Sequence, residues 1–337
     1  MNHWKETAEI LSRLAELRAA GRRAALATVV RIVGSAYRRP GAKFLIGESG
    51  DTLGSVSGGC LEADVREVAK GVMETGKPSL RHYSTGTDED IVWGLGLGCN
   101  GLVDVFIQPA TEGPLAELAD RLRELLAGDS AFAIATVLDG KEAGSATILE
   151  PEGANSAVQT VGDAQVFIEV LSPPPHLIVC GAGDDARPLV AYAADAGFRV
   201  TVVDHRQGLM QQEWFPQTAR LVLARPEEPV DLPPAARSLA VVKTHSLKHD
   251  REWVRRLLAA GLPYVGVLGP RARTETILRE IGATSSETER VFGPVGLDLG
   301  ADGPRQVSLA IVAELLAFIA HREPRHLSER REAIHAG

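Results

Sequence analysis

The chain has 337 residues, of which 45% are hydrophobic and 24% are charged, and its formal net charge is −8 at pH 7. This length allows two domains with a core each, and the acidic balance argues against a protein that binds nucleic acid or an anionic membrane. The sequence has no membrane-spanning apolar run and no signal peptide, and its three cysteines form no Cys-x-x-Cys pair. We therefore expect a cytoplasmic protein without a disulfide framework or a structural zinc site.

The first predicted elements are a helix and two strands. The helix covers Trp4–Ala20, and the β-branched run Ala24–Val33 predicts a buried strand. A loop with two adjacent arginines, Arg38 and Arg39, precedes a short strand at residues 43–46. Such an arginine pair can hold a phosphate, or it can be part of a solvated surface loop.

The most informative segment is Ser55-Val56-Ser57-Gly58-Gly59-Cys60-Leu61-Glu62. Apolar residues then recur with helical spacing, so Cys60 is predicted to lie where a strand ends, two glycines turn the chain and a helix begins. Gly58 and Gly59 permit a positive φ, which lets the amides of Ser57, Gly58 and Gly59 converge on one point. The helix N-terminus favours an anion or a thiolate there. The alternative is a tight turn around a small buried cysteine.

A second glycine cluster, Trp93–Gly101, contains Cys99 and precedes a predicted strand at Leu102–Ile107. Glycines before a strand suggest close approach to a ligand or to another segment of the chain. Because Cys60 and Cys99 both lie in glycine-rich turns, we expect them to face a common site, although packing would also explain the pattern.

The rest of the first half predicts a helix at Leu115–Leu126 and a hairpin, Ala131–Leu138 with Ala143–Leu149, around Asp139-Gly140. Three prolines then predict a stiff linker. The predicted organisation is a mixed α+β domain at residues 1–171, a linker at 172–175, a Rossmann-like domain at 176–321 and a charged tail at 322–337.

The segment after the linker reads as a dinucleotide-binding βαβ unit. A strand at His176–Cys180 leads into Gly181-Ala182-Gly183-Asp184-Asp185-Ala186, a helix to Ala196 and a strand at Phe198–Val203. Asp204 follows 23 positions beyond Gly181. The pattern therefore assigns Gly181, Gly183 and Asp204 to ligand binding, and Cys180 to the core.

The remaining elements predict an α/β domain with a doubly wound parallel sheet. The strands are Ala219–Leu223, Leu239–Val242 and Tyr264–Leu268, and the helices cover residues 250–260, 271–281 and Pro304–His321. His245 follows one of these strands, where switch-point ligands bind. It is either an acid–base residue or a loop histidine bonded to the backbone, and we favour the second interpretation.

These motifs resemble the xanthine dehydrogenase accessory family, the XdhC/CoxI proteins. The matching residues are Gly34-Ser35, Arg38-Arg39-Pro40-Gly41-Ala42, Gly54–Glu62, Gly94–Cys99, Gly181-Ala182-Gly183, Val203-Asp204, Thr244-His245, Gly266-x-Leu268-Gly269 and Pro294–Ala301. The resemblance spans nearly the whole chain. It departs at Asn100, where we expect glycine, and at Asp302–Gln306, where we expect an acidic helix start.

The resemblance implies a maturation factor, more a cofactor chaperone than an enzyme. Such a protein binds the molybdenum cofactor (molybdopterin), holds it during sulfuration and helps insert it into a molybdenum hydroxylase of the xanthine dehydrogenase type. A cysteine desulfurase supplies the sulfur, and a homodimer is expected. Soft sulfur suits this metal, so we expect Cys60, or else Cys99, to contact the molybdenum or its sulfur. Arg38 or Arg39 and the amides of residues 57–59 would then hold the cofactor's phosphate.

Three other functions remain open. An NAD(P)-dependent oxidoreductase would use Asp204 for the ribose and Arg206 for a 2′-phosphate, but no clear acid–base set for hydride transfer accompanies the fold. It also stays open whether Gly181, Gly183, Asp204 and His245 bind the pterin cofactor or a nicotinamide. A nucleotidyltransferase needs a phosphate loop that is not found near Met1. A scaffold without a ligand would expose an apolar patch.

Overall fold

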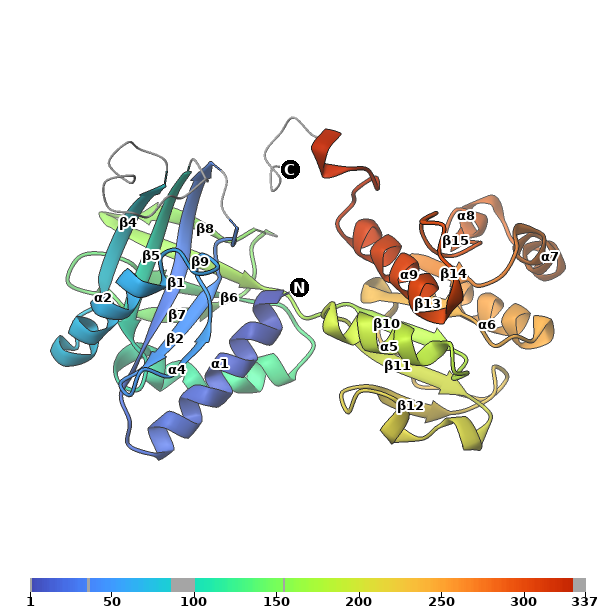
Figure 1. Ribbon diagram of the computed structural model, residues 1–337, viewed down its shortest axis with the longest axis horizontal. Helices are drawn as coiled ribbons and strands as arrows, with labels where there is room; N and C mark the ends of the chain where they lie inside the picture. Colours follow the sequence, from blue (N-terminus) through green and yellow to red (C-terminus); the bar gives the residue numbers. More distant parts are fainter. Residues whose placement is uncertain (1, 35–36, 86–100, 154, 330–337) are drawn as a thin grey trace. The chain divides into compact units, whose positions relative to one another are not determined.

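The computed structural model describes residues 2–34, 37–85, 101–153 and 155–329. The chain divides into two compact units, one formed by Met1–Pro173 with Leu327–Gly337 and the other by Pro174–His326 (Figure 1). The division falls between two prolines of the predicted linker. Each unit has hydrophobic clusters of its own.

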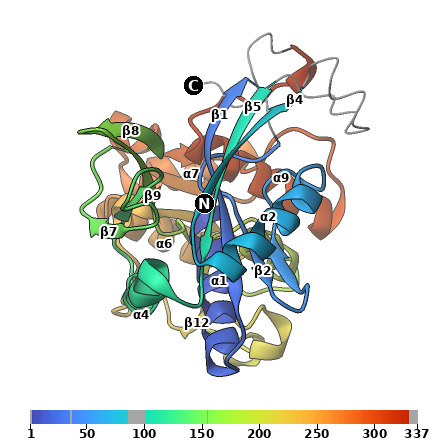
Figure 2. The same ribbon diagram turned by 90° about the vertical axis from the view of Figure 1, so that its left-hand side faces the viewer.

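The first unit begins with α1 (Asn2–Ala19), which precedes a five-stranded antiparallel sheet in the order β3-β2-β1-β5-β4. The strands are β1 (Ala24–Gly34), β2 (Lys43–Gly47), β3 (Thr52–Gly54), β4 (Ser79–Thr85) and β5 (Gly101–Pro109). Figure 2 shows β1, β5 and β4 running side by side.

Residues Ala24–Val30 of β1 are buried on both faces, as the β-branched run predicts, whereas Arg31, Val33 and Gly34 are exposed. Leu26 packs with residues of α1 and α4 (Gly113–Ala127), whereas Ala25 and Ala27 pack with the apolar face of α2 (Glu62–Thr75). Since neighbouring strand residues point to opposite faces, this alternation places helices on both sides of the sheet.

A second antiparallel sheet of the first unit has the order β7-β6-β9-β8. Its strands are β6 (Phe132–Val137), β7 (Ala146–Leu149), β8 (Ala157–Val161) and β9 (Ala164–Leu171). The pairing of β6 with β7 confirms the predicted hairpin. Val30 and Phe106 of the first sheet form one cluster with Leu138 and Phe167, so the two sheets share a core.

The second unit contains a six-stranded parallel sheet in the order β12-β11-β10-β13-β14-β15. The strands are β10 (His176–Cys180), β11 (Arg199–Asp204), β12 (Arg220–Leu223), β13 (Ser238–Val242), β14 (Tyr264–Val267) and β15 (Val291–Phe292). The predicted doubly wound sheet is confirmed. The strand order reverses between β10 and β13, and ligands of open α/β sheets bind at such a switch point.

Helices cover both faces of this sheet. On one face α5 (Ala186–Asp195) packs against α9 (Gly303–Ile319), and on the other α6 (Leu247–Ala259) packs against α7 (Arg271–Ile281). A short helix, α8 (Ser285–Thr288), precedes β15, and single 3-10 turns lie at Gln207–Leu209, Gln212–Trp214, Ala235–Arg237 and Leu327–Glu329. Cys180 is wholly buried in the α6 face, which confirms its prediction as a core residue. None of the described helices combines the length and apolar character needed to cross a membrane.

Candidate functional site

The segment Ser55–Glu62, called the Cys60 loop below, joins β3 to α2. Strand β3 ends at Gly54 and α2 begins at Glu62, as the sequence predicts. Gly58 and Gly59 have φ angles of 87° and 124°. Side chains other than hydrogen are strained at such angles, so the glycines permit this turn.

The converging amides of the Cys60 loop bind a carboxylate of the chain itself, that of Glu62. Its Oε1 accepts hydrogen bonds from the Ser55 hydroxyl at 2.7 Å and from the amides of residues 56–58 at 2.9 to 3.2 Å. Its Oε2 accepts from the Ser57 hydroxyl at 2.5 Å and from the Gly59 amide at 2.9 Å. Six donors therefore surround one side chain.

This arrangement keeps Glu62 ionised. Burial opposes the charged form, but hydrogen bonds from Ser57 and Ser55 outweigh it and lower the pKa of Glu62 to about 2. The predicted phosphate donors, the amides of Ser57, Gly58 and Gly59, are thus already paired with an anion. A phosphate would have to displace Glu62 to reach them, so their role in cofactor binding stays a prediction.

Cys60 has an exposed, free thiol. The alternative prediction of a small buried cysteine is therefore wrong. Among the described residues, no group of three or more His, Cys, Asp or Glu side chains is arranged to hold a metal ion. Cys60 can accordingly offer one soft sulfur atom rather than a closed set of metal ligands. Cys99 lies outside the described residues, so the predicted common site of the two cysteines stays a prediction.

Arg38 is turned toward α1 rather than displayed to solvent. Its Nη2 donates to both carboxylate oxygens of Glu6, at 2.5 and 2.6 Å, while its Nε is buried without a hydrogen-bond partner. Arg39 is exposed. The two adjacent arginines therefore have different environments. Arg38 is paired within the protein, so the prediction of a solvated surface loop fits Arg39 but not Arg38.

Tyr37 connects the arginine loop with the Cys60 loop. A Cβ atom added to Gly58 would lie 3.0 Å from the Tyr37 ring, so the ring rests on the glycine backbone. The Tyr37 side chain is nevertheless 76% exposed. An aromatic ring and the Cys60 thiol are thus presented to solvent by two loops in direct contact.

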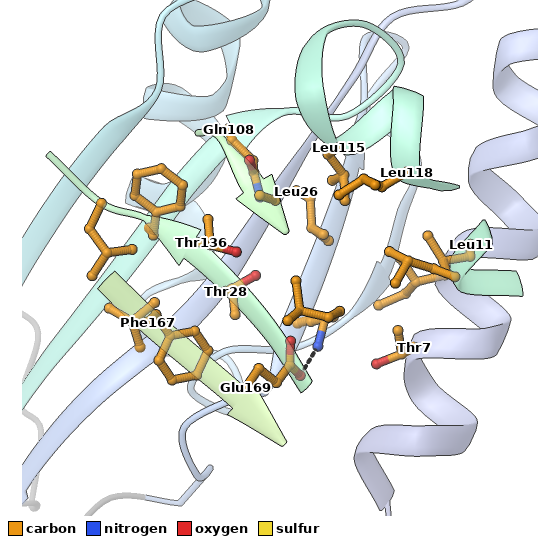
Figure 3. A pocket seen from close by; sticks show the side chains of 18 residues that line it. Thr7, Leu11, Leu26, Thr28, Gln108, Leu115, Leu118, Thr136, Phe167 and Glu169 are labelled. Carbon is orange, nitrogen blue, oxygen red and sulfur yellow. Dashed lines mark hydrogen bonds and ion pairs between the residues drawn. The ribbon is translucent and has the colours of Figure 1, made fainter. Parts of the chain in front are cut away.

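A buried polar cluster lies next to Arg38. The ammonium of Lys43 pairs with the Glu169 carboxylate of β9 and donates to the Gly41 carbonyl at 3.1 Å, and both charged side chains are almost wholly buried (Figure 3). The Lys43 carbonyl accepts the Ser55 amide at 2.9 Å, which anchors the start of the Cys60 loop. Burial, and after it the charge of Lys43, lowers the pKa of His3 to about 4.

An internal cavity of about 40 Å³ adjoins this cluster, between the two sheets and α1 (Figure 3). Thr7 lines it, and its buried hydroxyl has no hydrogen-bond partner. A cavity of this size holds a few water molecules, whereas pockets for drug-sized ligands measure roughly 300 to 1,000 Å³. The cavity is therefore too small for a pterin.

In the second unit, the two predicted glycines serve contacts within the chain. Gly181 has a φ of 120°, and a Cβ atom there would lie 2.5 Å from the Lys243 carbonyl oxygen. A Cβ atom at Gly183 would lie 2.9 Å from a carboxylate oxygen of Asp185. Gly181 thus allows the end of β10 to approach the end of β13, and Gly183 leaves room for the Asp185 side chain.

Asp204, predicted to hold a ribose, turns back into the protein. Its buried carboxylate accepts the Ala182 amide at 2.8 Å and the Arg206 guanidinium at 2.7 Å. Burial opposes its ionisation, but the hydrogen bond from Arg206 leads the effects that lower the pKa of Asp204. Asp204 and Arg206, the residues predicted to bind a ribose and a 2′-phosphate, therefore pair with each other.

His245 has a partner that the sequence did not indicate. Its Nε2 lies 2.9 Å from a carboxylate oxygen of Asp185, 60 positions earlier in the chain. The favoured prediction, in which the His245 side chain bonds to the backbone, is therefore wrong for Nε2, because its partner is a side-chain carboxylate. His245 also has a φ of 60°, which is uncommon for a residue other than glycine.

Sequence reasoning missed the acidic partners of the site. One usable signal existed for Glu62, because an acid in the first turn of a helix after a glycine loop suits the amides there. No local signal pointed to Glu6 or Glu169, which lie 32 and 126 positions from Arg38 and Lys43.

Comparisons with known proteins cover most of the chain. The family model "XdhC and CoxI family" matches residues 17–84, which include the Cys60 loop, and "XdhC Rossmann domain" matches residues 177–315. A probable xanthine dehydrogenase subunit of Bacillus subtilis (strain 168) is 32% identical over 311 residues, which cover 87% of this chain and 92% of that protein. The "Molybdenum cofactor insertion chaperone PaoD" of Escherichia coli (strain K12) is 25% identical, covering 90% of this chain and 86% of that protein. A crystal structure described as a xanthine dehydrogenase from Bacillus halodurans is 28% identical with a TM-score of 0.78, covering 94% of this chain and 97% of that one.

Proposed function

Because the chain belongs to the XdhC and CoxI family, we propose that it is an accessory protein that carries molybdenum cofactor to a molybdenum hydroxylase of the xanthine dehydrogenase type. The relative named as a molybdenum cofactor insertion chaperone supports this function. The observation that carries the proposal is the Cys60 loop, which presents an exposed thiol on a rigid backbone.

Glu62 gives the loop its rigidity. Six hydrogen bonds to one carboxylate fix the backbone on the N-terminal side of Cys60, and α2 fixes it on the other side. A thiol held in this way meets a ligand with little loss of conformational entropy. We therefore assign to Cys60 the contact with the molybdenum or its terminal sulfur.

The contacts of the other predicted residues favour supporting roles. Ser57, Gly58 and Gly59 hold Glu62, and Arg38 ties its loop to Glu6 of α1. Arg39, on the exposed side of the same loop, is our choice for an anionic group of the cofactor. Protection of the cofactor during sulfuration, sulfur supply by a cysteine desulfurase and a homodimeric state are further parts of the proposal.

The contacts in the second unit give no support to the NAD(P)-dependent oxidoreductase. Asp204 and Arg206 are paired, and Asp184 and Asp185 stand at the start of α5, where a dinucleotide would place its pyrophosphate. Both carboxylates are paired with cations of the chain, Asp184 with Arg187 and Asp185 with Lys243, so these cations are not available to a pyrophosphate.

The proposal is tested by transfer of cofactor to a hydroxylase. The full chain is loaded with molybdenum cofactor under anaerobic conditions and mixed with a cofactor-free hydroxylase, and the recovered hydroxylase activity is measured. We expect Cys60→Ala to lose most of the transfer. Cys180→Ala is the matched control, because it removes a thiol that is wholly buried in the other unit. Equal transfer by the wild type and Cys60→Ala would refute the role of Cys60, and loss only in Cys99→Ala would move it to that residue.

A further inference from the structure

A buried ion pair of the first unit has no part in the proposed function. Lys43 is the first residue of β2 and Glu169 lies in β9, so the pair joins the two sheets of this unit (Figure 3). Their side chains are 5% and 7% exposed. Taking two charges out of water costs free energy, and apolar side chains of similar size are often at least as stabilising. The value of such a pair can instead lie in fixing one arrangement of its neighbours.

The pair holds the end of the arginine loop, which comprises residues 37–42. The Lys43 ammonium donates to the Gly41 carbonyl at 3.1 Å. A Cβ atom added to Gly41 would lie 3.2 Å from Oε1 of Glu169, so the carboxylate rests on the glycine backbone. The Gly41 amide donates in turn to the Val29 carbonyl of β1 at 2.7 Å. Gly41 is therefore held both by β1 and by the buried pair.

Lys43 also holds the start of the Cys60 loop, through its main chain. Its carbonyl accepts the Ser55 amide at 2.9 Å. Gly54, the residue before Ser55, has a φ of 85°, and a Cβ atom there would overlap the Lys43 carbonyl oxygen. Glycine at this position thus permits the close approach of β3 to β2. One residue, Lys43, consequently contacts both loops.

The two loops also contact each other directly, where the Tyr37 ring rests on Gly58. Arg39 lies two positions from Tyr37, and Cys60 lies two positions from Gly58. Both Arg39 and Cys60 are exposed. Since Gly41 is two positions beyond Arg39 in the same loop, its place affects how far the Arg39 guanidinium lies from the Cys60 thiol.

We propose that Lys43 and Glu169 are positioning residues that set the separation of Arg39 and Cys60. They act through the Gly41 carbonyl and make no contact with a ligand themselves. This inference rests on the proposed function in one respect, because there Arg39 and Cys60 contact the same cofactor. The separation of the two side chains is nevertheless a property of the protein alone, and it can be measured without a cofactor.

Alkylation of Cys60 reports the charge beside its thiol. The full chain is treated at low ionic strength with iodoacetate, which is an anion, or with neutral iodoacetamide, and the rate at Cys60 is followed by peptide mass spectrometry. Both reagents attack the same thiolate, so the ratio of the two rates depends on nearby charge and not on the amount of thiolate. We expect Arg39→Ala to lower the preference for iodoacetate about twofold.

The variant that tests the pair is Lys43→Met combined with Glu169→Met. It removes both charges together, so no buried charge is left unpaired, and Arg38 remains tied to Glu6. We expect it to lose the preference for iodoacetate to the same extent as Arg39→Ala, because the arginine loop is no longer held by the ammonium. Urea unfolding of each variant shows that it is folded under the conditions of the alkylation.

Two comparisons separate positioning from a general effect on the fold. Arg23→Met combined with Glu48→Met removes an ion pair whose hydrogen bonds reach neither loop, and it should keep the preference of the wild type. Adding Arg39→Ala to the Lys43 and Glu169 replacements should lower the preference no further, because the pair acts through the position of Arg39.

Gly41→Ala tests the same contact without removing a charge. Its Cβ atom would press on Glu169, so the loop should shift and the preference for iodoacetate should fall. A preference equal to that of the wild type in Arg39→Ala, in Gly41→Ala or in the double methionine variant would overturn the proposal. A further twofold loss on adding Arg39→Ala would overturn it as well. Failure of cofactor transfer would refute the proposed function but would not change these rates.

Discussion

Replacement of Glu62 by glutamine gives the sharpest test of how the Cys60 loop is built. The side chain keeps its size but loses its charge, and an amide group now faces donors. Oε1 of Glu62 accepts four donors and Oε2 accepts two. If the oxygen of the glutamine side chain takes the place of Oε1, its NH₂ group takes the place of Oε2 and faces the Gly59 amide. The Gly59 N–H then loses its acceptor.

The size of the effect follows from the ionisation of Glu62. Its pKa is lowered from 4.5 to about 2. At about 1.4 kcal/mol for each pKa unit, the folded protein stabilises the carboxylate by about 3 kcal/mol. Gly58, Gly59 and Cys60 beside it are exposed, so solvent screening reduces this to about 2 kcal/mol. Because the folded pKa is depressed, this stability is present above pH 4.5 and is lost as the pH falls toward 2.

Hydrogen exchange of a peptide covering the Cys60 loop measures this free energy locally. We expect the amides of residues 56–59 to exchange about 30-fold faster in Glu62→Gln than in the wild type at neutral pH. Glu67→Gln is the matched control, because Glu67 lies on the same helix in an exposed pair with Lys70. Such pairs contribute little, so its exchange should match the wild type.

Unchanged exchange in Glu62→Gln would refute the reasoning, because it would mean that the carboxylate does not hold the loop. Equal acceleration in Glu67→Gln would also contradict it, since the effect would then come from α2 as a whole.

Three further predictions concern other parts of the chain. Arg38→Met should lower the unfolding free energy by about 2 kcal/mol in urea titrations, because Glu6 loses its partner, and Arg38→Met combined with Glu6→Gln should recover part of the loss. Gly181→Ala should lower the melting temperature markedly, since its Cβ would meet a carbonyl oxygen at 2.5 Å, whereas Gly208→Ala, with open space around it, should change it little. His3 has a pKa of about 4 because of burial and neighbouring positive charge, so its NMR titration should have its midpoint near pH 4. The unfolded chain protonates His3 near pH 6.5, whereas the folded protein does so only near pH 4. The contribution of His3 to the free energy of unfolding should therefore be constant above pH 6.5 and should fall as the pH is lowered from 6.5 to 4.

The fold was predictable where patterns are local and strong. Unbroken apolar strands between amphipathic helices identify the sheet of the second unit, and the glycine pattern locates its first turn. Strands β4, β8, β9 and the two-residue β15 were missed. β4 mixes Arg81 and His82 with apolar residues, and β8 is mostly exposed, so neither shows a clear periodic pattern.

The candidate site was predictable in its backbone but not in its partners. Gly58 and Gly59 indicate a turn with converging amides, and the structure has one. The anion that fills it is Glu62, which the phosphate interpretation did not weigh. Partners such as Glu6 for Arg38 and Asp185 for His245 depend on tertiary packing, and a single sequence carries no local sign of them.

The central claim, that this chain carries molybdenum cofactor at Cys60, is tested most directly by what the purified protein contains. Molybdenum is measured by elemental analysis and pterin by the fluorescence of its oxidised form, after anaerobic purification from cells that make the cofactor. We predict that the wild type contains molybdenum and pterin, and that Cys180→Ala contains as much of each as the wild type. Cys60→Ala should lose the molybdenum. Absence of both from the wild type, even after incubation with excess cofactor, would contradict the account.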